Sequence, residues 1–167
     1  MIKIFQLKAA RSVTGIGVRE LALYLGVSRT IVSRWEKQNP LDYIKTKKTN
    51  PETLVFFFKQ HNIIFPNKNT IALNNKPIKE DSSHDILTRF QLRAARSIIS
   101  LTQEELAKET KTSRKVINYL ETYKNTDLLN AKNKEINCTV FKTFFKKNGI
   151  SFSNLYSVEV NSKILRE

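Results

Sequence analysis

The first third of the chain alternates apolar stretches at helical spacing with short breaks. Residues 3–14 and residues 18–25 each repeat apolar side chains every three or four positions, which predicts two helices. Their apolar faces would hold Leu7, Ala10 and Thr14 and, in the second helix, Leu21, Ala22 and Leu25. Residues 15–17 (GIG) break the pattern, and Gly26 can end the second helix in the left-handed conformation at little cost.

A third helix is predicted to start at Ser28, whose hydroxyl can cap the free N–H groups of the first turn. Val32 and Trp35 lie three positions apart and would face the core. The opposite face would then carry hydrogen-bonding and basic side chains, namely Arg29, Thr30, Ser33 and Arg34.

A lysine-containing loop over residues 37–50 separates these helices from a fourth at residues 51–61. Pro51 suits the first turn of that helix, and its apolar side chains would close the core: Leu54, Phe57 and Phe58. Residues 63–73 read as two short apolar strands around a Pro/Asn turn, which predicts a β-hairpin.

The whole pattern recurs once. Residues 5–12 read FQLKAARS and residues 90–97 read FQLRAARS, and 13 of the 34 residues over 5–38 are identical at this offset of 85. Past a two-residue insertion the match continues at an offset of 87. The sequence therefore predicts two copies of one domain, at residues 1–74 and 86–161, joined by a polar linker at 75–85 and followed by a tail at 162–167.

Two hairpins in one chain suggest how the copies associate. An isolated two-stranded hairpin is marginally stable and leaves its edges open. We expect the two hairpins to pair with each other into a four-stranded sheet, giving a monomeric pseudo-dimer with approximate two-fold symmetry. The alternative is a homodimer in which the hairpins pair with those of a second chain.

Net charge indicates the class of partner. The chain has 29 Lys and Arg against 15 Asp and Glu, a net charge of +14, and both halves share the excess. Such a surface attracts polyanions, with nucleic acid as the leading candidate.

Other classes of function find little support. Cys138 is the only cysteine and the histidines number two, so we expect no disulfide, no metal and no cofactor, and a reducing cytoplasmic location. No apolar run has the length of a membrane span, so no membrane partner is expected. No catalytic set, phosphate loop or paired acidic cluster indicates an enzyme.

Residues 18–36 and 103–121 resemble the helix-turn-helix of the phage-repressor/Cro family, also called the xenobiotic-response-element family. Each segment has a small residue where two helices would cross (Ala22 and Ala107), a turn of three to four residues, and a Ser-Arg pair opening the second helix. The resemblance covers both copies almost completely. It implies a mainly α fold, with tandem repressor-like helical domains that each end in a β-hairpin, and a double-stranded DNA partner.

The resemblance also assigns roles to residues. A recognition helix reads base edges in the major groove with side chains near its N-terminal end. In the first copy the base-reading residues would be Arg29, Thr30, Ser33 and Arg34, and in the second Arg114, Lys115, Asn118 and Tyr119. For Ser33 and Tyr119, a simple solvated helix face is an equal alternative.

Backbone phosphates would be contacted by a second set, which comprises Arg19, Lys45, Lys47, Lys48, Gln103 and Lys124. Gln103 resembles the family's phosphate-contacting glutamine, and Thr102 with Glu105 forms the pattern of a capping box. Gly17-Val18 stands at the corresponding place in the first copy, and Lys111 replaces Gly26 in the second. These departures predict unequal affinities of the two units.

Two further pairs, Arg11 with Glu36 and Arg96 with Glu121, resemble the family's ion pair between the first and third helices. We expect partly buried bridges that fix the recognition helix, with phosphate contact by the arginines as a secondary role.

The leading function is a sequence-specific transcriptional regulator, with repressor as the first choice although the sequence does not give the sign of regulation. The alternative is a DNA-binding antitoxin or interaction module of a toxin–antitoxin pair, a type that the family contains.

Overall fold

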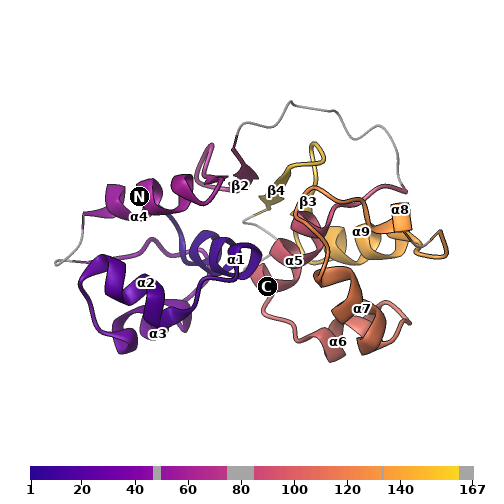
Figure 1. Cartoon of the computed structure of the whole chain (residues 1–167), viewed down its shortest axis with the longest axis horizontal. Helices are drawn as coiled ribbons and strands as arrows, with labels where there is room; N and C mark the ends of the chain where they lie inside the picture. The colour runs from indigo at the N-terminus through magenta and orange to yellow at the C-terminus, as the bar shows by residue number, and fades with distance from the viewer. Residues whose placement is uncertain (47–49, 75–84, 133, 162–167) are drawn as a thin grey trace.

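The computed structural model describes residues 1–46, 50–74, 85–132 and 134–161 (Figure 1). Its first half runs through α1 (Ile4–Thr14), α2 (Val18–Leu25), α3 (Arg29–Glu36), α4 (Pro51–Gln60), β1 (Ile63–Ile64) and β2 (Thr70–Leu73). Its second half runs through α5 (Arg89–Ile98), α6 (Gln103–Glu109), α7 (Arg114–Glu121), α8 (Leu129–Lys132), α9 (Cys138–Lys147), β3 (Ile150–Ser151) and β4 (Ser157–Val160). The described residues thus form nine helices and four strands, a mixed α/β structure that is mainly helical as predicted.

The strands form one antiparallel sheet in the order β1-β2-β4-β3. The two inner strands come from different halves of the chain, with Ile71 opposite Val158 and Ala72 opposite Ser157. The prediction that the hairpins pair within the chain is therefore confirmed. Because β2 and β4 each lie between two neighbours, only the two-residue strands β1 and β3 form the edges of the sheet.

The prediction for α1 was too simple. Leu7 and Ala10 are fully buried as expected, but Phe5, Gln6 and Ala9 on other sides of the helix are almost completely buried too. The reason is that α1 packs against α5 more extensively than any other two described elements pack together, and α5 is buried in the same way (Figure 1). Helices with two packing surfaces lose the single apolar stripe on which the prediction was based.

Polar bonds reinforce this contact between the halves. Arg89 lies in α5, is 8% exposed, and donates from Nη1 to the carbonyl oxygen of Val13 at the end of α1 at 2.8 Å. Ser97 of α5 donates from Oγ to the carbonyl oxygen of Lys8 in α1 at 3.1 Å. Burial lowers the pKa of the Arg89 guanidinium to about 10, with the like charge of Arg93 acting in the same direction.

A buried glutamine ties each hairpin to the first helix of its half. Gln6 donates from Nε2 to the carbonyl oxygens of Asn67 and Thr70, at 2.9 and 2.8 Å, and its Oε1 accepts from the backbone N–H of Lys3 at 2.9 Å. The side chain thus bonds three backbone groups, two of which belong to the buried residues Lys3 and Thr70.

Gln91 makes the corresponding bonds in the second half. Its Nε2 donates to the carbonyl oxygens of Asn154 and Ser157, at 2.7 and 3.4 Å, and its Oε1 accepts from the N–H of Thr88 at 3.0 Å. Both glutamines are almost fully buried. The same side chain at the same place in FQLKAARS and FQLRAARS therefore positions both hairpins.

Helix ends follow the sequence with one exception. Gly26 has φ 64° and Lys111 has φ 53°, so lysine does adopt the left-handed conformation where the first half has glycine. The predicted cap at Ser28 is wrong, because its side chain makes no capping hydrogen bond, whereas Ser113 accepts from the N–H of Val116. Ser28 keeps the extended backbone of a capping residue, and its carbonyl oxygen accepts from the N–H of Ile31.

Replacing either buried glutamine by alanine (Gln6→Ala or Gln91→Ala) should lower the free energy of unfolding by about 2–4 kcal/mol, since buried backbone groups lose their partners. Denaturant unfolding followed by circular dichroism measures this. Gln38→Ala, at an exposed position just after α3, is the control and should change stability by less than about 0.5 kcal/mol. Losses as small as that at both Gln6 and Gln91 would contradict the anchoring role.

Candidate nucleic-acid interface

Helix α3 separates an inward apolar face from an outward polar one. Val32 is fully buried and Trp35 is 4% exposed, so the predicted core face is confirmed. The four base-reading candidates of this helix lie on the other side, with Arg29, Thr30 and Arg34 exposed and Ser33 half-buried. The start of α2 meets this face, because Gly17, Arg19 and Arg29 line one shallow hollow of about 600 Å³ together with Thr30 and Ser33.

Helix α7 has the same division. Ile117 and Leu120 are fully buried, while the candidates Arg114, Lys115, Asn118 and Tyr119 are all exposed. The Tyr119 ring is 53% exposed and packs edge-on against the ring of Tyr123, with 5.2 Å between the centroids. Tyr119 is therefore partly held by a neighbour, whereas Arg114, Lys115 and Asn118 project into solvent.

Both helices are braced by the same arginine–glutamate geometry. Arg11 in α1 bonds Glu36, the last residue of α3, through Nε–Oε1 at 2.7 Å and Nη2–Oε2 at 2.9 Å. Its remaining nitrogen, Nη1, donates to the carbonyl oxygen of Ile16 before α2, at 2.7 Å. One guanidinium thus joins α1, the end of α3 and the turn that leads into α2. Two parallel bonds of this kind fix orientation as well as distance.

Arg96 repeats these bonds in the second half. It meets Glu121 at 2.6 and 2.9 Å and donates from Nη1 to the carbonyl oxygen of Leu101 at 2.7 Å. Both predicted ion pairs are therefore present and partly buried, with side-chain exposures of 17% and 18% for the first pair and 16% and 5% for the second.

Among the hydrogen bonds of the described residues, Glu121 accepts more than Glu36 does. Gln103 donates from Nε2 to Glu121 Oε2 at 2.9 Å, and Arg89 donates from Nε to the Glu121 carbonyl oxygen at 3.1 Å. Burial opposes ionisation of this carboxylate, but the hydrogen bonds from Arg96 and Gln103 outweigh that effect and hold its pKa below the ordinary value of 4.5.

The bond to Glu121 bears on the role expected of Gln103. The structure turns its amide nitrogen inward toward Glu121, so a phosphate could be met only by the second hydrogen of that amide. The capping box beside it is present, with Thr102 Oγ1 accepting from the Glu105 N–H at 3.2 Å and Glu105 Oε2 accepting from the Thr102 N–H at 2.7 Å. Gln103 therefore has a bracing contact that the sequence did not indicate.

The other phosphate candidates divide into two groups. Arg19, Lys45 and Lys124 are exposed, at the start of α2, in the loop before α4, and just after α7. Lys47 and Lys48 lie outside the described residues.

A basic pair between the two units was missed. Lys8 of α1 and Arg93 of α5 occupy equivalent positions of the repeat and line one hollow of about 330 Å³ together with Arg11 and Gly17. Burial lowers the pKa of both side chains, and Arg93 Nε has no hydrogen-bond partner among the described residues. The repeat contained the signal, since basic residues match at 8 and 93, but only the packing of α1 on α5 brings them together.

The helices that carry these surfaces lie on one side of the molecule. Figure 1 shows α3 and α7 along the lower edge, one in each half, with α1 and α5 between them and the sheet along the opposite edge. Gly17 lines both the hollow at α3 and the central hollow, so the basic surface continues from the first unit to the contact between the halves.

Comparison with protein-family models, curated proteins and solved structures finds no match for this chain. Within the described ranges no cluster of His, Cys, Asp and Glu could hold a metal ion. Nor does any helix there have the length and apolarity needed to cross a bilayer.

Glu121→Gln should lower the free energy of unfolding at neutral pH by about 1.5–3 kcal/mol, because Arg96 loses an ionised partner. A carboxylate with a lowered pKa stabilises the fold above its ordinary value of 4.5, and this contribution disappears as the pH falls further. The difference from the unmodified protein should therefore shrink below pH 4.5, as measured by urea unfolding across pH. Glu104→Gln removes an exposed carboxylate and serves as control. A difference that stays constant with pH would rule out the role given to Glu121.

Proposed function

We propose that this protein is a sequence-specific double-stranded DNA-binding transcriptional regulator, of the repressor type, built as two helix-turn-helix units in one chain. Each unit would insert one helix into the major groove, α3 in the first and α7 in the second. The observation that carries the proposal is the repeated combination of an exposed basic helix face, a buried apolar face behind it, and an arginine–glutamate brace at the end of the helix.

The dimensions and chemistry of DNA explain why this combination suits it. The major groove is about 12 Å wide and admits one helix with its side chains. Arginine can bond guanine O6 and N7 with two hydrogen bonds, and asparagine can bond adenine, each worth about 1–3 kcal/mol of discrimination. Arg29 and Arg114 are the first residues of α3 and α7. In helix-turn-helix proteins, this N-terminal end of the recognition helix enters the groove.

The arrangement of the two units favours a single DNA duplex as the partner. Both candidate helices, α3 and α7, lie on the edge opposite the sheet (Figure 1), and the hollow with Lys8 and Arg93 lies between them. In the proposed complex this central pair meets the phosphate backbone between the two half-sites. The shared sheet then connects the two units as a pseudo-dimer.

The double variant Arg29→Ala/Arg114→Ala should abolish sequence-specific binding and leave the fold intact, because both side chains are exposed and make no core contact. Fluorescence anisotropy with a selected operator and with a scrambled duplex measures the loss, and circular dichroism checks the fold.

A matched control is Lys59→Ala/Lys146→Ala, which removes two positive charges from exposed, repeat-equivalent positions on α4 and α9. It should keep the sequence preference. If the Arg29/Arg114 variant binds the operator with unchanged preference, the assignment of the reading faces is wrong.

Selection from random duplex DNA should yield two non-identical half-sites about 10 bp apart, centre to centre, on one face of the duplex. The half-sites should differ because Tyr119 stands where the first unit has Arg34. In the variant Arg34→Tyr the two half-sites should become more alike. Light scattering of the complex gives the number of chains per site, which should be one. Recovery of a single half-site, or of two identical ones, would contradict the proposal.

A further inference from the structure

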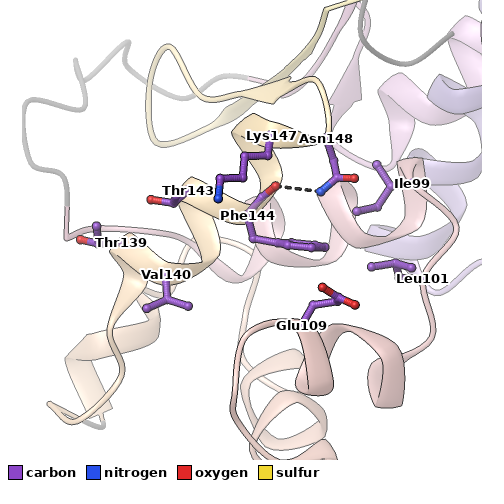
Figure 2. A pocket seen from close by; sticks show the side chains of 9 residues that line it. All are labelled: Ile99, Leu101, Glu109, Thr139, Val140, Thr143, Phe144, Lys147 and Asn148. Carbon is purple, nitrogen blue, oxygen red and sulfur yellow. Dashed lines mark hydrogen bonds between the residues drawn. The ribbon is translucent and has the colours of Figure 1, made fainter. Parts of the chain in front are cut away.

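A cavity of about 750 Å³ opens between α9, the end of α5 and the last turn of α6 (Figure 2). Its apolar walls are Ile99, Leu101, Val140 and Phe144. The volume is within the range of small-molecule sites, about 300–1,000 Å³, and mostly apolar walls with a few polar groups are typical of them.

The two charged groups of the lining stand on opposite sides of one aromatic ring. In Figure 2 the Glu109 carboxylate lies on one side of Phe144, and the Lys147 ammonium group lies on the other. Asn148 beside Lys147 donates from Nδ2 to the carbonyl oxygen of Phe144 at 2.9 Å. The site therefore offers a negative end, an aromatic middle and a hydrogen-bond-donating end.

The first half shows what fills the equivalent space there. At the repeat offsets Glu109 corresponds to Tyr24 and Phe144 corresponds to Phe57. The rings of Tyr24 and His61 pack against Phe57. The distance between ring centroids is 4.4 Å for Tyr24 and Phe57, and 4.6 Å for His61 and Phe57. Phe57 is consequently only 4% exposed.

In the second half no tyrosine at the position of Tyr24 packs on the equivalent ring, Phe144. Glu109 has no ring to pack on Phe144, and Phe144 is left half-buried beside an open cavity. The second half thus lacks a counterpart of the Tyr24 ring. The carboxylate of Glu109 stands at that position instead.

We propose that this cavity binds a small aromatic amine. The ring of the ligand packs on Phe144 as Tyr24 packs on Phe57, the ammonium group bonds Glu109, and a hydroxyl at the far end accepts from Lys147. Aromatic pairs favour the tilted or edge-on packing that the first half displays.

Local charge decides the sign of the ligand's charged group. The net charge of +14 repels cations at long range, but salt screens exposed charges beyond about 8 Å at physiological ionic strength. Glu109 is therefore the charge that an amine meets at its end of the cavity, while Lys147 lies beyond the Phe144 ring (Figure 2).

Tyramine is the probe, because it carries the tyrosine ring and hydroxyl on an ethylamine. Calorimetry and a ¹H–¹⁵N NMR titration of the full chain, without DNA, should show one saturable site with shifts centred on Ile99, Leu101, Val140 and Phe144. Uncharged 4-ethylphenol should bind about tenfold more weakly, since it lacks the ion pair with Glu109. No saturable binding up to about 10 mM tyramine, or shifts centred elsewhere, would overturn the proposal.

Variants at Glu109 test separately the space left open over Phe144 and the negative charge of the carboxylate. Glu109→Tyr restores the residue of the first half and should weaken tyramine binding at least tenfold, whereas Glu104→Tyr adds the same ring at an exposed position of α6 and should not. Glu109→Gln should weaken tyramine but not 4-ethylphenol. If the Glu109→Tyr variant has an unchanged circular dichroism spectrum and still binds tyramine, the assignment of the cavity is wrong. These titrations contain no DNA, so their outcome is independent of the proposed function.

Discussion

Each hairpin has a two-residue outer strand and a four-residue inner strand, too little to be stable alone. The pairing of β2 with β4 is therefore the constraint on which the rest of the structure depends. Helix α1 packs against β2 and α5 packs against β4, so joining the inner strands brings the two helices together, and α1 lies against α5. The buried Gln6 and Gln91 transmit this arrangement, because each bonds the backbone of its own hairpin.

The two halves share the arginine–glutamate pairs that brace their helices, but they differ at several other equivalent positions. The arginine–glutamate braces agree to within 0.1 Å in their Nε–Oε1 distances, 2.7 and 2.6 Å. By contrast, Ser100 with φ 59° stands where the first half has Gly15, and Glu109 stands where it has Tyr24. A left-handed backbone costs a residue with a side chain roughly 1 kcal/mol, so the second half carries this strain at Ser100. The reverse holds at Asn62, with φ 62°, where the second half has Gly149.

Periodicity and repeat offset predicted much of this fold. The inward positions of Val32 and Trp35, and the pairing of the hairpins, follow from apolar spacing and from the instability of open edges. The meeting of Lys8 with Arg93 could not be predicted, because a sequence period records one packing surface and α1 has two. The bond from Gln103 to Glu121 depends on how the start of α6 is set against the end of α7, a distance that no local pattern encodes.

The sheet shared by the two halves has a consequence for how they stay together. When complementary strands belong to separate molecules, their association follows the law of mass action and fails on dilution. Here both strands belong to one chain, so each half meets its counterpart at a fixed effective molarity set by the covalent connection. The halves should remain assembled in a cell holding only a few copies. Mutations can also alter either half alone, an asymmetry that an association of identical subunits does not permit.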